Sequence, residues 1–502
     1  MAESPRTTAT ALSDASPIRG PSVSTWQASR PEVVTGATSG QSPVVMRIGI
    51  ALVAGLSVVL LGASAASVGP GTTRPMVLEH VAVIDGTGAD LESDMTIVIE
   101  DGRITALGPS GKVRLPNDAD VRSLPGHFAM PGLIDVHAHA RAAWVMESLL
   151  AYGVTSIRNP SSSRAGGTDF AAEVNSGRLA GPTVVTAGPI IDAPPRRTGR
   201  GPLVTTPDEM RQAVRQQAAD GVQWIKLYVN VTAPLVEAAV DEARRHGLRV
   251  GGDLVATSWV DGARLGIDVI SHLASRDPEL LPVRYRDDYR QLVSAPESNR
   301  LWQIVQWLEW IDPEGDEVRK AARAMAATGV AVDPTLVVLE AIILHADSAY
   351  RRSIDASRVP TQVAQSWTTA WNVPFPADYV ARRSGIRANS LRLARTLHDA
   401  GVPLLAGTDT PLPWVPPGAS LHRELELLVE AGIPPLDVIR IATSNAARSL
   451  GVDSLRGTVQ VGLQADLLVL RENPLEDIRS TRAIHCVLKA GREVRVAGLR
   501  PC

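Results

Sequence analysis

The sequence is poor in cysteine and in net charge. Its 502 residues include two cysteines, Cys486 and Cys502, so neither a disulfide framework nor a thiolate zinc site can be built. Lysine and arginine number 50 against 53 acidic residues, which gives a formal net charge of −3, and no basic run is present to follow a phosphate backbone. We therefore expect no nucleic-acid partner. A metal site would have to use histidine, carboxylates or lysine.

The N-terminal region does not have the pattern of a folded domain. Residues 1–45 are rich in Ser, Thr, Pro, Ala and Gly without apolar periodicity, which predicts disorder. Residues 46–66 read MRIGIALVAGLSVVLLGASAA: one positive charge, an apolar run and small residues that fit an export cleavage site. We expect an exported protein whose translation starts at Met46, which would make residues 1–45 a non-native extension. The alternative is a membrane anchor, since residues 48–68 are long enough to cross a bilayer.

Short β-branched segments punctuated by Gly and Asp lie on both sides of a long middle section. They occur in residues 75–130, for example MVLEHVAVIDGTG, and in residues 456–502, for example IHCVLKAGREVRVAG. We expect the two stretches to form one small composite β-sandwich domain. Residues 431–455 carry a helical pattern and are expected to lead the chain back to that domain.

The middle section, residues 131–430, alternates apolar strands with helical patterns. The strands are expected at Leu133–Val136, Thr155–Ile157, Thr183–Thr186, Trp224–Val229, Leu248–Val250, Asp268–Ser271, Val330–Val332 and Pro403–Ala406. Eight β-then-α units predict an α/β fold of the (β/α)8 or TIM barrel type. The stretch from about residue 280 to about residue 400 is longer than plain units need, so we expect a helical insertion there.

The motif MPGLIDVHAH, residues 130–139, ends the first of these strands. Its two histidines, His137 and His139, would face the same side of a strand and suit a divalent metal. A His-x-His pair alone is a weak signal. Side chains at the carboxyl ends of barrel strands gather at one place, however, and that is where catalytic residues of this fold lie. Three later strands end in further candidates, namely Lys226, His272 and Asp409.

These segments resemble the amidohydrolase superfamily, and within it the imidazolonepropionase-related and Xaa-Pro-dipeptidase-like enzymes with a carboxylated lysine. The resemblance covers residues 76–497. It rests on MPGLIDVHAH, WIKLYV, ISHL, AGTDTP, ELELLVEAGIPPLDVIRIATSNAARSLG and VGLQADLLVLRENPLEDI. It implies a hydrolase of amide-type C–N bonds that depends on a divalent metal, with zinc as the first candidate and one or two ions bound.

The resemblance also implies a role for each candidate residue. His137 and His139 would bind the first metal, and Lys226, as a carbamate formed with carbon dioxide, would bridge two metals. His272 would bind the second metal, while Asp409 would bind the first and act as general acid and base. The lysine step is chemically coherent, because burial lowers the pKa of a lysine and leaves a neutral amine that can add carbon dioxide.

Tyr228 and Asp253 are two further candidates. Tyr228 shares the strand face of Lys226 and could polarise a substrate carbonyl, although a structural hydroxyl is an equal alternative. Asp253, in GGDLVA, stands where the resemblance leads us to expect a histidine that binds the second metal. Aspartate is an acceptable zinc ligand, so we expect Asp253 to bind this metal; alternatively, the second site is lost.

The leading prediction is a metal-dependent amidohydrolase that acts on a peptide, an N-acyl amino acid or a cyclic amide. A metal lowers the pKa of bound water to about 7, so hydroxide attacks the carbonyl while Asp409 passes the proton to the leaving nitrogen. One alternative is an esterase, lactonase or phosphotriesterase with the same site. Another is an exported binding protein whose metal site is degenerate. The sequence leaves open which small molecule is the substrate and whether copies of the chain assemble.

Overall fold

The computed structural model describes most of the chain after the predicted export segment. The described residues are 67–68, 74–162, 167–195, 201–295, 299–371, 375–376 and 378–502. The predicted extension, residues 1–45, and the predicted export segment, residues 46–66, lie outside them. In the described part, no helix is both long enough and apolar enough to cross a membrane.

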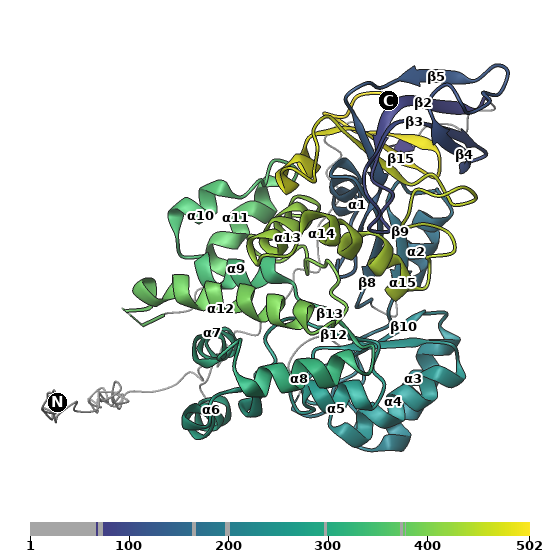
Figure 1. Ribbon diagram of the computed structural model, residues 1–502. Helices are drawn as coiled ribbons and strands as arrows, with labels where there is room; N and C mark the ends of the chain where they lie inside the picture. The colour runs from purple at the N-terminus through teal and green to yellow at the C-terminus, as the bar shows by residue number, and fades with distance from the viewer. Residues whose placement is uncertain are drawn as a thin grey trace, which may run out of the picture. The chain divides into compact units, whose positions relative to one another are not determined.

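Strands from both ends of the described chain form one nine-stranded mixed sheet (Figure 1). They are β1 (Ser67–Val68), β2 (Met76–Val83), β3 (Glu92–Glu100), β4 (Arg103–Pro109), β5 (Asp120–Ser123), β6 (Phe128–Pro131), β14 (Leu467–Leu470), β15 (Ile484–Lys489) and β16 (Arg492–Arg495). The order is β1-β16-β15-β14-β6-β2-β3-β4, and β5 pairs with β2. The antiparallel pairing of β6 with β14 joins the two ends. Apolar side chains such as Leu78, Ile97 and Leu488 form the core of this sheet, because alternate strand residues share a face.

Seven parallel strands follow in the middle section. They are β7 (Leu133–Asp135), β8 (Val154–Asn159), β9 (Thr183–Thr186), β10 (Trp224–Leu227), β11 (Arg249–Gly252), β12 (Val269–Ser271) and β13 (Ala331–Asp333). The first three form one sheet and the last four another, and every neighbouring pair is parallel. Each strand coincides with one of the first seven strands predicted from the sequence, so those seven predictions are confirmed.

Single backbone pairings extend both parallel sheets. Ala187 pairs with Trp224, which places the end of β9 beside the start of β10. The eighth predicted strand, residues 403–406, is not a regular strand, but Leu404 pairs with Val332. On its other side, the carbonyl of Ala406 accepts a hydrogen bond from the amide of Val136 at 3.0 Å. The segment 403–406 therefore connects β13 to the residue that follows β7.

Helices follow the parallel strands along the chain. Those before β12 are α1 (Ala143–Ala151), α2 (Gly167–Asn175), α3 (Pro207–Ala219), α4 (Ala233–Arg245) and α5 (Trp259–Arg264). Between β12 and residue 403 lie η1 (Pro278–Leu280), α6 (Val283–Ser294), α7 (Arg300–Trp310), α8 (Asp316–Ala326), α9 (Leu336–Leu344), α10 (Ser348–Ser353), α11 (Thr361–Ala370) and α12 (Tyr379–Asp399). The extra helices fall in the stretch where the sequence predicts an insertion. After residue 406 come α13 (Ala419–Glu430), α14 (Pro435–Ala442) and α15 (Ser444–Leu450), and η2 (Ile478–Arg482) lies between β14 and β15.

Helix α7 is anchored by tryptophan. Trp307 is fully buried, its indole nitrogen donates to the carbonyl of Asp277 at 2.9 Å, and its ring meets that of Trp259 on α5 edge to face at 6.3 Å. The side chain of Asn299 accepts from the amide of Leu301 at 2.8 Å and caps the helix. The first turn of α7 therefore has a fixed position.

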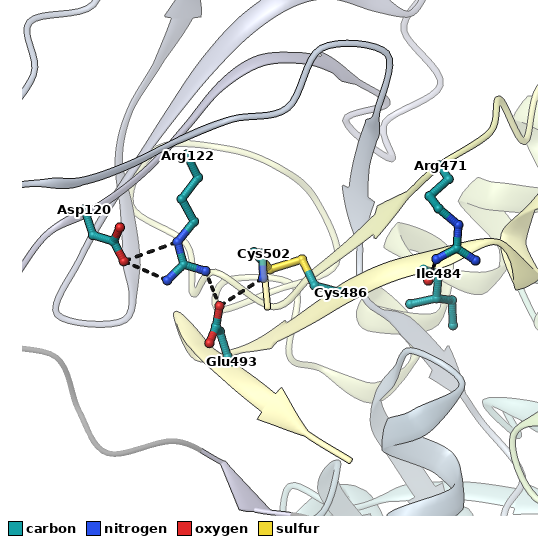
Figure 2. The surroundings of a disulfide bond; sticks show 7 residues. All are labelled: Asp120, Arg122, Arg471, Ile484, Cys486, Glu493 and Cys502. Carbon is teal, nitrogen blue, oxygen red and sulfur yellow. Dashed lines mark hydrogen bonds and ion pairs between the residues drawn. A yellow bond between two sulfur atoms is a disulfide. The ribbon is translucent and has the colours of Figure 1, made fainter. Parts of the chain in front are cut away.

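The two cysteines form one disulfide that ties the end of the chain to β15 (Figure 2). Cys486 lies on β15, Cys502 is the last residue, and their Cα atoms are 5.3 Å apart. The amide of Cys502 donates to the carboxylate of Glu493 at 3.0 Å, and Glu493 also pairs with Arg122, which binds Asp120. A framework of several disulfides stays excluded, but this single bond was not predicted from the sequence.

Candidate metal centre

Four of the predicted site residues converge at the carboxyl ends of parallel strands. His137 and His139 follow β7, His272 follows β12, and Asp409 follows residues 403–406. The Nε2 atoms of His139 and His137 lie 2.9 Å and 3.4 Å from Oδ1 of Asp409. The Nε2 atom of His272 lies 3.9 Å from Oδ2 of the same carboxylate. Three imidazoles therefore face one carboxylate.

His137, His272 and Asp409 form the tightest part of this group. One candidate ligand atom from each lies within 4.8 Å of the other two. His272 and Asp409 adopt left-handed backbone conformations, with φ of 69° and 57°, which are costly for residues other than glycine. Backbone bonds hold both turns: the His272 amide donates to Asp333 and the Asp409 amide donates to His137, each at 2.7 Å. The fold thus fixes the direction of both side chains.

Two of the imidazoles are also held by their other ring nitrogen. Nδ1 of His137 lies 2.6 Å from Oδ2 of Asp333, and Nδ1 of His272 lies 2.9 Å from Oγ1 of Thr335. A carboxylate on Nδ1 fixes the proton there and leaves Nε2 as the lone pair that a metal can use. Asp333 and Thr335 were not among the site residues predicted from the sequence. A polar pair at the end of a predicted strand, in AVDPT, was the available signal.

Burial and charge set the protonation states of this group. Burial lowers the pKa of His137 well below its usual value and that of His272 to about 4, against the opposing effect of Asp409. Burial raises the pKa of Asp409, but His137, His139 and His272 together outweigh this effect, and the net result is a pKa below the usual value. At neutral pH, His137 and His272 are therefore neutral beside an ionised carboxylate. This is the state in which such groups bind a metal.

Lys226 is buried on β10 and donates from Nζ to Oγ of Ser271 at 3.1 Å. Burial, helped by the charge of Arg158, lowers its pKa to about 8, while Asp253 and Asp409 oppose the shift. A fraction of the lysine is therefore neutral near neutral pH, as addition of carbon dioxide requires.

Arg158, on β8, links Asp333 to this interior. The arginine is buried, its Nε donates to the carbonyl of Val136 at 2.7 Å, and its guanidinium lies 4.6 Å from the ring centre of Trp224. Its Nη2 lies 3.6 Å from Oδ2 of Asp333, the oxygen that contacts His137. Arg158 therefore supports the position of Asp333 behind the imidazole.

The carboxylate of Asp253 faces cations instead of imidazoles. It follows β11, and its Oδ2 accepts from Nη2 of Arg300 at 2.6 Å. Its Oδ1 lies 3.5 Å from Nη2 of Arg276. Burial raises the pKa of Asp253, but Arg300 and Arg276 outweigh this effect and lower the pKa below its usual value, so the carboxylate is ionised. Its assignment as a metal ligand stays a prediction, and this pairing counts against it.

Tyr228 belongs to the same cluster as Asp253. It follows β10, it is buried, and its hydroxyl oxygen accepts a hydrogen bond from Nη1 of Arg300. The guanidinium carbon of Arg300 lies 5.2 Å from the centre of the tyrosine ring. The proposed role of Tyr228 toward a carbonyl stays a prediction. No sequence pattern pointed to Arg300, which begins a helix of the insertion.

Comparisons with known proteins agree with this geometry. The chain matches the model of the Amidohydrolase family over residues 128–494. It is 26% identical over 465 residues to an ochratoxinase from Aspergillus niger, which covers 84% of this chain and 86% of the relative. It is 27% identical over 411 residues to an imidazolonepropionase from Cupriavidus pinatubonensis, with 76% and 85% covered. A solved Xaa-Pro dipeptidase with bound methionine, 20% identical, shares the fold with a TM-score of 0.60 over 84% of this chain and 99% of that chain. The resemblance stated from the sequence is confirmed.

Proposed function

Because this chain belongs to the amidohydrolase family, we propose that it is a metal-dependent hydrolase that cleaves an amide-type C–N bond in a small molecule. The observation that carries the proposal is the convergence of His137, His139 and His272 on Asp409. The relatives are named for three different substrates, so membership of the family does not select one of them.

We assign metal binding to these four residues together with Lys226. Neutral imidazole nitrogens and a carboxylate oxygen are donors that zinc takes in proteins, so the residues present fit this ion. When bound, zinc supplies Lewis-acid chemistry, which acidifies water and polarises a carbonyl. As a carbamate, Lys226 would contribute an oxygen donor in place of a positive charge. One ion suits this set, because Asp253 is paired with arginines.

Asp409 and Tyr228 have the chemical roles in this proposal. The lowered pKa of Asp409 keeps it ionised, so its carboxylate can accept the proton of the attacking water and pass it to the leaving nitrogen. Tyr228 accepts a bond from Arg300, which leaves its own proton free for a substrate carbonyl oxygen. Asp333 holds His137 from behind and keeps its Nε2 directed at the centre.

We also propose that β7 to β13 and residues 403–406 close into a (β/α)8 barrel, and that the nine-stranded sheet folds as a β-sandwich. The pairings of Ala187 with Trp224 and of Val332 with Leu404 support the closure. The metal centre would then lie at the carboxyl-end rim of the barrel, where this fold places catalytic residues.

The test combines metal content with turnover. The purified protein is reconstituted with zinc and bicarbonate, its zinc is measured by mass spectrometry, and release of amine is followed on dipeptides, N-acyl amino acids and cyclic amides. We expect bound zinc and cleavage in at least one of these classes. In His272→Gln both are expected to fall, whereas the control His398→Gln, on α12, is expected to resemble the wild type.

Two results would contradict the proposed function. A protein that keeps no zinc after reconstitution and cleaves nothing would support the alternative of an exported binding protein with a degenerate metal site. Cleavage of esters, lactones or phosphotriesters alone, run alongside the amides, would assign the site to another bond.

We further propose that the protein is exported. The bond between Cys486 and Cys502 supports this location, because disulfides persist in oxidising compartments. N-terminal sequencing of the native protein is expected to find a start shortly after the small residues that end the segment 46–66. A mature protein that still begins before this segment would contradict cleavage.

A further inference from the structure

We propose that Arg300 forms a carboxylate-binding subsite beside the metal centre, so that the substrate carries a free carboxylate close to the bond that is cleaved. The inference rests on the proposed function, because it places the substrate at that centre. It arises from a guanidinium that two buried groups, Asp253 and Tyr228, hold at the ends of neighbouring strands.

Two bonds fix the guanidinium of Arg300. Nη2 donates to Oδ2 of Asp253 at 2.6 Å, and Nη1 donates to the hydroxyl oxygen of Tyr228. Asp253 follows β11 and Tyr228 follows β10, so both partners are positioned by the parallel strands. Arg276, which is buried, backs the other oxygen of Asp253. A donor that is already held in place loses little freedom when it binds a ligand.

The same guanidinium keeps donors for a ligand. An arginine has five N–H groups in a planar fork, and the bonds to Asp253 and Tyr228 use two of them. The guanidinium of Arg300 makes no further hydrogen bond within the described part of the chain, and 38% of the side chain is exposed. A carboxylate is the group whose two oxygens match this fork.

The local charge favours an anion. Asp253 is one negative charge between Arg276 and Arg300, so the three side chains carry a net charge of about +1. Burial lowers the pKa of Arg300, but Tyr228, Asp253 and Asp409 outweigh this effect and raise the pKa above its usual value, so the arginine stays charged. Asp253 follows β11, which pairs with β12, and His272 follows β12, so the guanidinium is held at the same strand ends as the metal centre. A carboxylate on Arg300 would therefore lie near the groups that cleave the bond.

A purely structural ion pair is the competing explanation of Arg300. In that case, removing the guanidinium would destabilise the first turn of α7 and weaken the binding of charged and neutral ligands alike. In a subsite, the loss would depend on the charge of the ligand. A comparison of acids with their neutral counterparts separates the two explanations.

The experiment uses free amino acids and their carboxamides, which match in shape and lack the negative charge. Thermal shift selects the best pair, and titration calorimetry then measures both Kd values on zinc-loaded wild type, Arg300→Met and Arg300→Lys. We expect the wild type to bind the acid about ten-fold or more tightly than the amide. Arg300→Met is expected to lose this preference while it keeps its zinc and its affinity for the amide, and Arg300→Lys to keep part of it. Arg323→Met, an exposed arginine on α8, is the matched control.

Equal affinity of the wild type for acid and amide would overturn the subsite, and so would an equal loss for both in Arg300→Met. If that variant does not fold, Asp253→Asn/Arg300→Met, which removes the two charges together, is measured in its place with the same expected result. Zinc content and turnover are read separately from binding. A retained preference for acids without any turnover would therefore refute the hydrolase and leave the subsite standing.

Discussion

Two carboxylates at the ends of the parallel strands have opposite surroundings. Asp409 faces three imidazoles, and Asp253 faces two guanidinium groups. Both are largely buried, with 14% and 4% of their side chains exposed. Asp253 follows β11, and Asp409 follows residues 403–406, whose Leu404 pairs with Val332 of β13. Neutral nitrogen donors leave the charge of Asp409 for a metal cation, whereas fixed guanidinium groups already neutralise that of Asp253. The partners, not the residue type, separate the two roles.

Replacement of Asp409 should give the largest effect in this comparison. Asp409→Asn is expected to keep the fold and to lower kcat/KM by about 10²–10⁴-fold, because an amide cannot carry the proton from water to the leaving nitrogen. Steady-state kinetics with zinc analysis on the same sample measures it. Wild-type rates in this variant would remove the distinction between the two carboxylates.

Replacement of Lys226 should have the second-largest effect on turnover. Lys226→Met is expected to lower turnover roughly 100-fold or more. Loss of a metal ligand should reduce activity more than loss of a residue that only supports a ligand. Acetate, which supplies an oxygen donor without a covalent bond, should restore part of the activity. Lys320→Met, an exposed lysine on α8, serves as the control. Full activity in Lys226→Met would contradict the carbamate.

Asp333 tests whether the support behind the imidazoles matters. Asp333→Asn is expected to weaken zinc binding about 10-fold, because a neutral amide oxygen holds Nδ1 of His137 less strongly. Competition with a chelator of known affinity measures the change. An unchanged affinity would show that the strand end alone orients the ring.

The histidines around Asp409 should also make the free energy of unfolding depend on pH, whereas Asp253 should not. Because burial lowers the pKa of His272 to about 4 from its usual 6.5, the unfolded chain takes up this proton first as the pH falls. The metal-free protein should therefore lose about 2 kcal/mol of its free energy of unfolding through His272 between about pH 7 and about pH 5, and regain it as the pH rises. Asp253, with its lowered pKa, stays ionised over this range. Urea unfolding of wild type and His272→Gln should show the smaller pH slope in the variant, and equal slopes would speak against the assignment.

Asp253→Asn should have the smallest effect on the metal. Its zinc content is expected to equal that of the wild type, while the free energy of unfolding falls by about 1–2 kcal/mol, because the buried Arg276 loses a charged partner. Zinc titration and urea unfolding on one preparation give both quantities. Loss of zinc would make Asp253 a ligand after all and would end the contrast with Asp409.

The strands and the residues at their ends could be predicted because the signal is local. Apolar β-branched runs marked the seven regular strands, and His137, Lys226, His272 and Asp409 could be named because each ends such a run. The eighth segment, residues 403–406, shows the limit of this rule: its backbone pairs with both neighbours without forming a regular strand.

The partners of those residues could not be predicted, because pairing over long separations leaves no periodic mark. Arg300 lies 47 residues after Asp253 and begins a helix, and Asp333 lies 196 residues after His137. An aspartate in place of an expected histidine suggests a ligand by residue type alone, and only the arginines around Asp253 argue otherwise. The disulfide at the end of the chain is a similar case, because two cysteines carry no sign that they pair.

Arg300 is supplied by α7, whereas the residues assigned to the metal are supplied by strand ends. The residue that would select a ligand therefore lies on an inserted helix, and the residues that would cleave the ligand lie at the strand ends, so each set can be mutated without changing the other. Redesign of the stretch from α6 to α7 offers a way to retune which molecules are accepted while the reactive apparatus is left untouched. The same division would allow new substrates to be acquired in evolution through mutations in the inserted helices alone.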